Sequence, residues 1–449
     1  MFEFRRELKR LFQVDGPKDG LTGGDASLLE LLDLDMLRAE GRMADIAAGR
    51  ISAKDPPQRQ LEASIVWREI ARRSGDAAAL RKAASAAELA AKDFSREARP
   101  KDWARARCEQ ALAALLAADL FGDEGLKAAA DHALAEVQRC AGAGLGSTLA
   151  AYGRARIHAD SLRDTGQRDA VVEAAERYAA ALSSIESPGR RRAAARLLAA
   201  EVRTARAEFL ASCGVRLRDV VLLRMAVDGF AQASAALDPA YEPLSWVRAA
   251  TGRATAAASS AALDGDIAAI AQAASDLVDV LEHLTRDHSP LDWARSQLAL
   301  AGVLQMLGEA TESRRAFDQA VACHDQAQMA LGGLPALVER AGAAYQRAVC
   351  LARRGELCGD LAGLAEAETA LRAELAASSP ARDPVGWAVR QLNFARLYEA
   401  RAAIVGRDRG ERAAAAMALS AALEVFSEYG CRSLAETAAR GLERLSLAG

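Results

Sequence analysis

Apolar positions along most of the chain fall in long runs rich in alanine and leucine, and short polar segments with glycine, proline or aspartate separate these runs. None of the runs shows the alternation of apolar and polar residues that is typical of strands. Proline is tolerated in the first turn of a helix, because its missing N–H would have no intrahelical partner there. The pattern therefore predicts a chain of helices joined by short turns.

Four of the runs open in the same way, with a proline three residues before a tryptophan. The pairs are Pro100 and Trp103, Pro243 and Trp246, Pro290 and Trp293, and Pro384 and Trp387. Together with glycine and proline breaks elsewhere, they place repeat starts near residues 56, 100, 144, 188, 243, 290, 335 and 384. Turns inside the units are expected at Gly75, Gly122, Gly265 and Gly308.

Such a repeat is the signature of a solenoid, in which a unit buries its apolar face only against its neighbours. We therefore expect residues 56–449 to form an all-α solenoid of about eight antiparallel helical hairpins. The chain is 51% hydrophobic but only 5% aromatic, and small alanines supply much of the apolar total, which suits closely packed helices.

The unit opened by Trp293 carries a more specific pattern. Its spacing of Leu300, Ala301, Leu304, Gly308, Phe317 and Ala320 resembles the packing positions of a tetratricopeptide repeat. The Trp387 unit keeps the first half of that pattern in Phe394, Ala395 and Tyr398. The family's period is about 34 residues, so these look like tetratricopeptide-like hairpins with lengthened helices. Gln297 and Gln391 stand where that family has an aromatic residue.

The resemblance implies a right-handed superhelix with a concave groove that binds a peptide or another protein, and it implies no catalysis. Carrying over the family's groove-facing positions points to partner-binding residues at Arg248, Arg295, Gln305, Arg396 and Glu399. Arg248 and Arg295 both follow a tryptophan by two residues, so repeat stacking places them on neighbouring helices. Guanidinium groups pair well with carboxylates, and the hypothesis is an acidic peptide held along the groove. The alternative is a solvated helix face.

The net charge and the cysteine pattern limit which class of partner and which cellular compartment we expect. A formal net charge of −3 leaves no basic excess for nucleic acid. The seven cysteines are odd in number and contain no C-x-x-C pair, as expected of reduced thiols. The sequence shows no secretory leader and no apolar run of about 20 residues, so we expect a cytoplasmic protein.

Catalytic and metal-binding motifs are not found in the sequence. None of the five histidines belongs to a ligand-spaced pair, and neither a P-loop nor a dinucleotide-binding glycine motif is present. We therefore expect no enzymatic activity, no metal site and no cofactor.

Residues 1–26 are predicted to be an amphipathic helix followed by a flexible linker, and residues 27–55 a helical cap on the first repeat. Docking residues of the first helix are Phe2, Phe4, Arg5, Leu8, Leu11 and Phe12. Three interpretations stay open for residues 1–12: docking to a partner protein, weak contact with an anionic membrane surface, or packing on the first repeat. Ser27 and Glu30 have the spacing of a capping box, which predicts a second helix from there to about Ala48.

The function expected from these features is a non-catalytic scaffold or adaptor that binds a partner in its groove, with the N-terminal helix as a second docking site and recruitment to the membrane periphery as an option. One alternative is a peptide-sensing regulator or secretion chaperone whose superhelical pitch changes when the groove fills. A peripheral membrane adaptor is the other.

Overall fold

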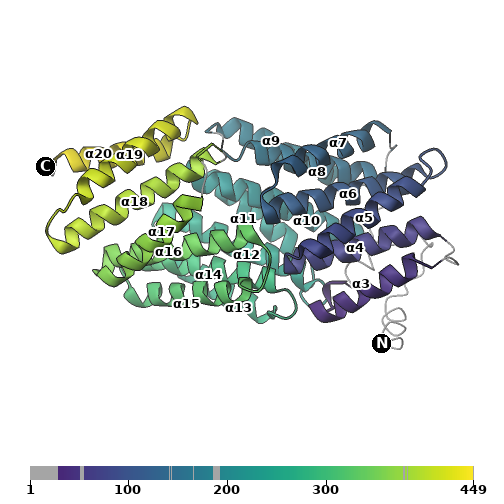
Figure 1. Ribbon diagram of the computed structural model, residues 1–449, viewed down its shortest axis with the longest axis horizontal. Coiled ribbons are helices and arrows are strands. Elements are labelled where there is room, and N and C mark those ends of the chain that lie inside the picture. The colour runs from purple at the N-terminus through teal and green to yellow at the C-terminus, as the bar shows by residue number, and fades with distance from the viewer. Residues whose placement is uncertain are drawn as a thin grey trace.

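A computed structural model describes residues 29–50, 55–140, 142, 144–164, 166–185, 193–377, 380–381 and 383–447. These residues form helices and turns, and no strand occurs among them, so the all-α prediction is confirmed. The helices stack side by side along the longest axis of the molecule, with α3 and α20 near its opposite ends (Figure 1). None of the helices in the described ranges is long and apolar enough to cross a membrane.

Sixteen consecutive helices alternate between two kinds. The first helix of each pair, termed here the A helix, is one of α4 (Pro56–Ser74), α6 (Pro100–Phe121), α8 (Leu145–Ser161), α10 (Ala193–Leu217), α12 (Pro243–Asp264), α14 (Pro290–Thr311), α16 (Leu337–Cys358) and α18 (Pro384–Val405). The second, the B helix, is one of α5 (Ala77–Asp93), α7 (Glu124–Cys140), α9 (Arg168–Ile185), α11 (Val220–Ala235), α13 (Ile267–Glu282), α15 (Arg314–Leu331), α17 (Leu361–Ala377) and α19 (Glu411–Glu428). Helix α3 (Leu34–Ala48) precedes the pairs and packs on α4, and α20 (Arg432–Leu447) follows them and packs on α19.

The ends of these helices follow from proline and glycine chemistry. Proline stands in the first turn of α4, α6, α12, α14 and α18. Five A helices end at a glycine in the left-handed region, where a residue without Cβ meets no steric penalty; these are Gly75, Gly122, Gly265, Gly359 and Gly406. The prediction for Gly308 was wrong: it lies inside α14, where a Cβ would come within 3.0 Å of the Phe317 ring. Glu312 ends that helix in its place, with φ of 51°.

The A helices form an inner layer. Successive A helices pack on one another from α4 to α18, whereas each B helix packs mainly on the A helices beside it. The coil also closes on itself, because α4 packs on α14, α6 on α16 and α10 on α20. The first turn of the superhelix is therefore in direct contact with elements more than 200 residues further along the chain.

The recurrent tryptophans pack at the joints between hairpins. Trp103 is buried among residues of α4, α6, α7 and α8, and Trp246 lies against both Leu237 and Leu284. Trp67, which is out of phase with the others, donates a 2.7 Å hydrogen bond from Nε1 to Asp45 on α3. That contact fastens the helix before the repeats to the first A helix.

The N-terminal boundary differs from the expectation. Residues 29 and 30 are helical, a bend follows, and α3 starts only at Leu34 with Asp33 as its N-cap. A single helix from residue 27 to Ala48 was therefore wrong. Ser27 lies outside the described residues, and the Glu30 carboxylate is turned toward α12 rather than toward its own helix start.

Candidate functional site

The inner surface carries charged side chains from several A helices. The surrounding protein raises the pKa of Glu208 on α10 by desolvation, and the positive charges of Arg156 and Arg295 act to lower it. Arg156 comes from α8 and Arg295 from α14, so three A helices contribute charge to one space.

Ion pairs between consecutive A helices organise the charges on this surface. Arg248 Nε and Nη2 donate to the two carboxylate oxygens of Asp292, each at 2.9 Å. Arg295 pairs with Glu339, and Arg353 lies 3.1 Å from Glu309. In these three pairs the partners are 44 residues apart. Arginine and acid therefore recur with the spacing of a repeat.

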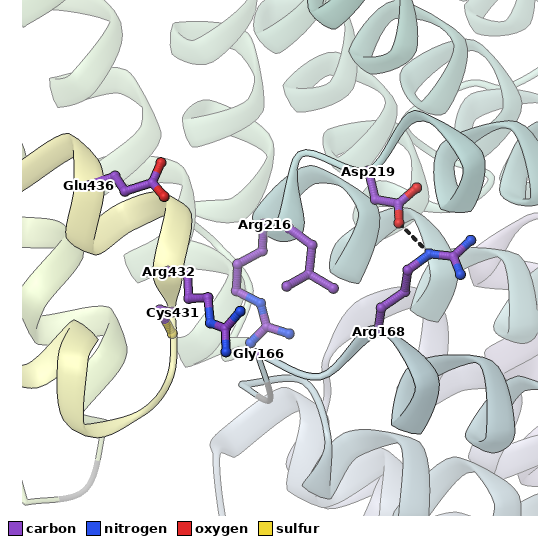
Figure 2. A pocket seen from close by; sticks show the side chains of 8 residues that line it. Gly166, Arg168, Arg216, Asp219, Cys431, Arg432 and Glu436 are labelled. Atoms are coloured by element: carbon purple, nitrogen blue, oxygen red, sulfur yellow. Dashed lines mark hydrogen bonds and ion pairs between the residues drawn. The ribbon is translucent and has the colours of Figure 1, made fainter.

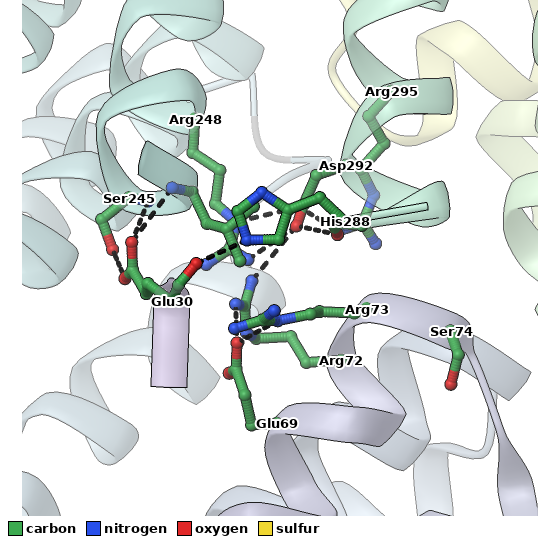
Figure 3. A network of polar contacts seen from close by, with 12 residues as sticks. Glu30, Glu69, Arg72, Arg73, Ser74, Ser245, Arg248, His288, Asp292 and Arg295 are labelled. Atoms are coloured by element: carbon green, nitrogen blue, oxygen red, sulfur yellow. Dashed lines mark hydrogen bonds and ion pairs between the residues drawn. The ribbon is translucent and has the colours of Figure 1, made fainter. Parts of the chain in front are cut away.

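Asp292 is the point where several of these contacts meet. Its side chain is 1% exposed and accepts from Arg248, from Ser289 Oγ at 2.6 Å and from Arg72 at 3.4 Å, while Arg295 lies 3.9 Å away. Arg72 belongs to α4, so this carboxylate joins the first hairpin to the fifth and sixth (Figure 3). A buried carboxylate with several charged donors is stabilising only while all partners are present.

Glu30 enters the same region from the N-terminal side. Its Oε2 accepts from the backbone N–H groups of Leu244 and Ser245, both at 3.0 Å, and its Oε1 accepts from Ser245 Oγ at 2.5 Å. These donors are the N-terminus of α12, whose partial positive charge favours a carboxylate. Burial raises the pKa of Glu30 to about 7, against the Ser245 hydrogen bonds and Arg72, which lower it.

Arg73 holds the backbone beside Glu30. This side chain is 0% exposed, and its Nη1 and Nη2 donate to the carbonyl oxygens of Leu32 and Leu29, each at 2.6 Å. Its Nε donates to Glu69 at 2.6 Å. Burial acts to raise the pKa of Glu69, but Arg72 and Arg73 lower it to about 2. The carboxylate of Glu69 therefore stays ionised and fixes both arginines.

His288 completes the arrangement. Its Nε2 lies 2.5 Å from the carbonyl oxygen of Glu30, and Figure 3 shows the ring between Glu30 and the Asp292 group. Burial lowers the pKa of His288, although the hydrogen bond to Glu30 acts to raise it. Because a carbonyl oxygen only accepts, Nε2 of His288 is the donor in this hydrogen bond.

The partner-binding residues predicted from the sequence all have partners within the chain. Arg248 and Arg295 lie on neighbouring A helices, and both contact Asp292. Gln305 donates to Glu309 at 2.9 Å, Arg396 lies 3.6 Å from Glu356, and Glu399 lies 3.2 Å from Arg444. The first two share one cluster with Arg72 and Glu30, and the last two pair toward the C-terminal end. Phe2, Phe4, Arg5, Leu8, Leu11 and Phe12 lie outside the described residues.

Sequence reasoning missed Glu30, Arg72, Arg73, His288 and Asp292 as members of one site. An acid placed 44 residues after Arg248 and another 44 after Arg295 is a signal that the sequence does contain. The contacts of Glu30 and Arg72 cross more than 200 residues, and no local pattern marks them.

A second candidate is a cavity of about 300 Å³ beside the first turn of α20 (Figure 2). Its lining consists of Gly166, Arg168, Arg216, Leu217, Asp219, Cys431, Arg432 and Glu436. Arg168 donates to Asp219 at 2.6 Å and Arg216 to Asp164 at 3.1 Å. Carboxylates therefore already pair two of the three arginines that line this cavity.

No group of three or more His, Cys, Asp or Glu side chains able to hold a metal ion occurs in the described part of the chain. All seven cysteines are free, and burial raises the pKa of Cys108 and Cys350, which makes their thiols poor nucleophiles. His324 is buried, neither ring nitrogen has a hydrogen-bond partner, and burial lowers its pKa to about 4.

No family model matches the chain, and no curated protein matches it. Among solved structures, the chain is similar to a Rap protein complexed with Competence and Sporulation Factor, with 13% identity and a TM-score of 0.51 over 88% of this chain and 99% of that one. A circular tandem repeat protein with novel repeat topology and enhanced subunit contact surfaces matches with 15% identity over 93% of this chain and 96% of that one. Its TM-score of 0.26 is too low for a structural conclusion. At 13% identity, the likeness to the Rap protein extends to the fold alone.

Proposed function

We propose that the protein is a non-catalytic binding module that holds an acidic segment of a protein or peptide partner against the inner surface of its solenoid. The observation that supports this most is the group of arginines on neighbouring A helices, Arg72, Arg248 and Arg295, whose head groups converge on Asp292. Guanidinium groups held in fixed positions bind carboxylates strongly, because little side-chain entropy remains to be lost. The similar Rap structure also contains a bound factor.

Arg295 is the arginine of this group that a partner reaches most easily, because its side chain is 42% exposed while that of Arg248 is 25% and that of Arg72 is 16% exposed. The electrostatic interaction of Arg295 with Glu208 supports its role on the inner surface. A partner carboxylate would share Arg295 with Glu339, where the surrounding protein strengthens the interaction over that in open water.

The closure of the coil favours a second candidate function, a regulator whose compactness responds to its partner. Asp292 connects the first hairpin to the sixth, and Glu30 connects the segment before α3 to the fifth, through buried polar contacts. A ligand shifts such an arrangement only if it binds the open and closed forms with different affinity. Small-angle scattering with and without the partner separates the two functions: a regulator changes its radius of gyration, and a static adaptor keeps it.

The test of binding is an array of acidic peptides probed with the full chain, followed by affinity measurements on the peptides retained. Arg295→Glu should weaken their binding at least tenfold. Arg314→Glu is the matched control, because Arg314 is 62% exposed on the outer helix α15 and lies 3.9 Å from Asp318. If both variants bind the retained peptides with the same affinity as the unmodified chain, the inner surface is not the binding site.

Two further parts of the proposal concern residues 1–12 and the compartment. The amphipathic pattern of residues 1–12 supports a second docking site, with weak contact to an anionic membrane surface as the alternative. Seven unpaired cysteines support a reducing compartment such as the cytoplasm. Cross-linking with mass spectrometry on the intact chain and on one lacking residues 1–13 tests the docking site, since selective loss of one partner is expected.

A further inference from the structure

Residues 29–34, termed here the Glu30 turn and ending in the first residue of α3, lie on the inner surface in the manner of a bound ligand. Its contacts come from three separate places: Arg73 on α4, Leu244 and Ser245 at the start of α12, and Asp287 and His288 just before α14. Leu29, Leu32 and Leu34 pack against the apolar cluster that contains Trp67 and Leu291. A short segment thus meets a site built almost entirely from the solenoid.

Most of this recognition is made through the backbone. Arg73 donates to the carbonyls of Leu29 and Leu32, His288 donates to the carbonyl of Glu30, and the N–H of Leu34 donates to Asp287 O at 3.2 Å. Backbone contacts do not depend on side-chain identity, so another segment of the same shape can make them. Peptide-binding proteins commonly combine backbone contacts with a few pockets that select side chains.

The one position at which the site selects a side chain is that of Glu30, whose two carboxyl oxygens accept from the start of α12. Helix α12 begins without a side-chain cap of its own, because its N-cap residue Glu242 accepts instead from Asp238 N at 2.9 Å and pairs with Arg196. The N–H groups of Leu244 and Ser245 are therefore satisfied by a carboxylate from elsewhere in the chain. A side chain without two acceptor oxygens there would leave at least one of the donors from Leu244 and Ser245 without a partner.

We propose that the Glu30 turn is an intramolecular ligand: it occupies an acidic-peptide site formed by Arg73, Ser245 and His288, and a partner segment that presents a glutamate at the end of a helical turn competes for that site. This inference rests on the proposed function and names the ligand class and its regulation. Because the turn is tethered, its high effective concentration keeps the site filled until a tighter partner arrives. Helix α3 keeps its own contacts with α4 when the turn leaves.

The experiment measures binding of a fluorescent synthetic peptide of residues 25–36 to the full chain by anisotropy. The Glu30→Ala variant should bind this peptide at least tenfold more tightly than the unmodified chain, because its own carboxylate no longer competes. A peptide in which Glu30 is replaced by glutamine should bind the Glu30→Ala variant at least tenfold more weakly than the original peptide does. The matched control is Asp35→Ala in the full chain, because Asp35 is 92% exposed on α3 and pairs only with Arg38 among the contacts described. This variant should bind the peptide with the same affinity as the unmodified chain.

Hydrogen exchange on the unmodified chain keeps the inference testable even if Glu30→Ala does not fold. The amides of Leu244 and Ser245 should exchange through a local opening that leaves α14 and α16 protected. If they exchange only when the whole chain unfolds, or if the folded Glu30→Ala variant does not bind the peptide, the Glu30 turn is a permanent part of the core and the inference is wrong.

The result also separates this inference from the proposed function. A partner that binds through Arg295 with the same affinity in Glu30→Ala and in the unmodified chain would support the binding module and refute competition by the Glu30 turn. A peptide that binds Glu30→Ala while no external partner does would support the intramolecular ligand and count against the proposed function.

Discussion

At the scale of single residues, the charged side chains of the inner surface act first as connectors between hairpins. Arg248, Arg295 and Arg353 each pair with an acid 44 residues away, and Asp292 adds Arg72 from the first hairpin. A solvent-exposed ion pair contributes little to stability, whereas removal of one partner from a buried group leaves charges without compensation. We therefore expect the buried ion pairs of this protein to contribute much more to the free energy of unfolding than the exposed ones.

Asp292→Asn should lower the free energy of unfolding by about 3 kcal/mol, because Arg72 and Arg248 would lose their shared carboxylate inside the protein. Urea denaturation monitored by circular dichroism measures this. The control is Asp264→Asn, whose side chain is 45% exposed and pairs with the largely exposed Arg224; a change within about 0.5 kcal/mol is expected. Equal losses for both variants would contradict the central role of Asp292.

The raised pKa of Glu30 predicts how stability depends on pH. Its pKa of about 7 in the folded state lies above 4.5, so the folded state binds the proton more tightly and loses stability as pH rises through that interval. The free energy of unfolding should fall by up to about 3 kcal/mol across this interval. Arg72, Glu69 and Ser245 face this carboxylate, and His288, whose pKa is lowered, acts in the opposite sense because its contribution is lost as pH falls.

The measurement compares the unmodified chain with Glu30→Gln at pH 5.5 and pH 8, so that His288 and the other groups common to both cancel. The difference in unfolding free energy, unmodified chain minus variant, should be smaller at pH 8. A difference that does not change with pH would mean that Glu30 ionises as it does in water.

At the scale of helices, the ends are set by backbone conformation more than by side-chain contacts. Gly265 ends α12 with φ of 75° and has open space where a Cβ would lie, whereas Glu312 ends α14 with φ of 51° despite its Cβ. A residue with a Cβ in this region costs roughly 1 kcal/mol relative to glycine.

Glu312→Gly should therefore raise the free energy of unfolding by about 1 kcal/mol, and Gly265→Ala should lower it by about the same amount. Thermal or urea unfolding of the two variants checks the pair. Reversed signs, with a loss for Glu312→Gly and a gain for Gly265→Ala, would show that the entropy of the unfolded chain, rather than strain at the helix end, decides the outcome.

The helix starts were predictable because their cause is local. Pro100, Pro243, Pro290 and Pro384 each stand in a first helical turn, and this preference depends on no distant residue. Gly308 does not mark a turn, because a glycine inside a helix can serve close packing, here of Phe317. The site around Glu30 was beyond prediction, because it depends on the pitch of the superhelix, which brings residue 30 beside residue 244.

At the scale of the whole molecule, the coil closes at a second place near the C-terminus. The turn between α8 and α9 approaches the turn between α19 and α20 so closely that a Cβ on Gly166 would overlap the carbonyl oxygen of Gly430. Helix α20 also packs on α10. The solenoid is thus not a simple row in which each repeat touches only its neighbours.

Gly166→Ala should loosen this second closure without disturbing the rest. Faster hydrogen exchange and faster proteolysis are expected in α20, with α4 and α14 unchanged. Gly333→Ala is the control, because a Cβ at Gly333 would meet no atom within 4 Å. Unaltered exchange in α20 of the Gly166 variant would mean that the two turns shift apart at little cost.

The contact between α4 and α14 also has a consequence during synthesis of the chain. Arg72 and Glu30 are made early, but the groups that receive them, Ser245 and Asp292, leave the ribosome only after more than 200 further residues. At about 5 to 20 residues per second, this is a delay of roughly 10 to 40 seconds, in which the first hairpin has charged and apolar groups without their final partners. We therefore expect the nascent amino-terminal third to need protection by chaperones during this delay.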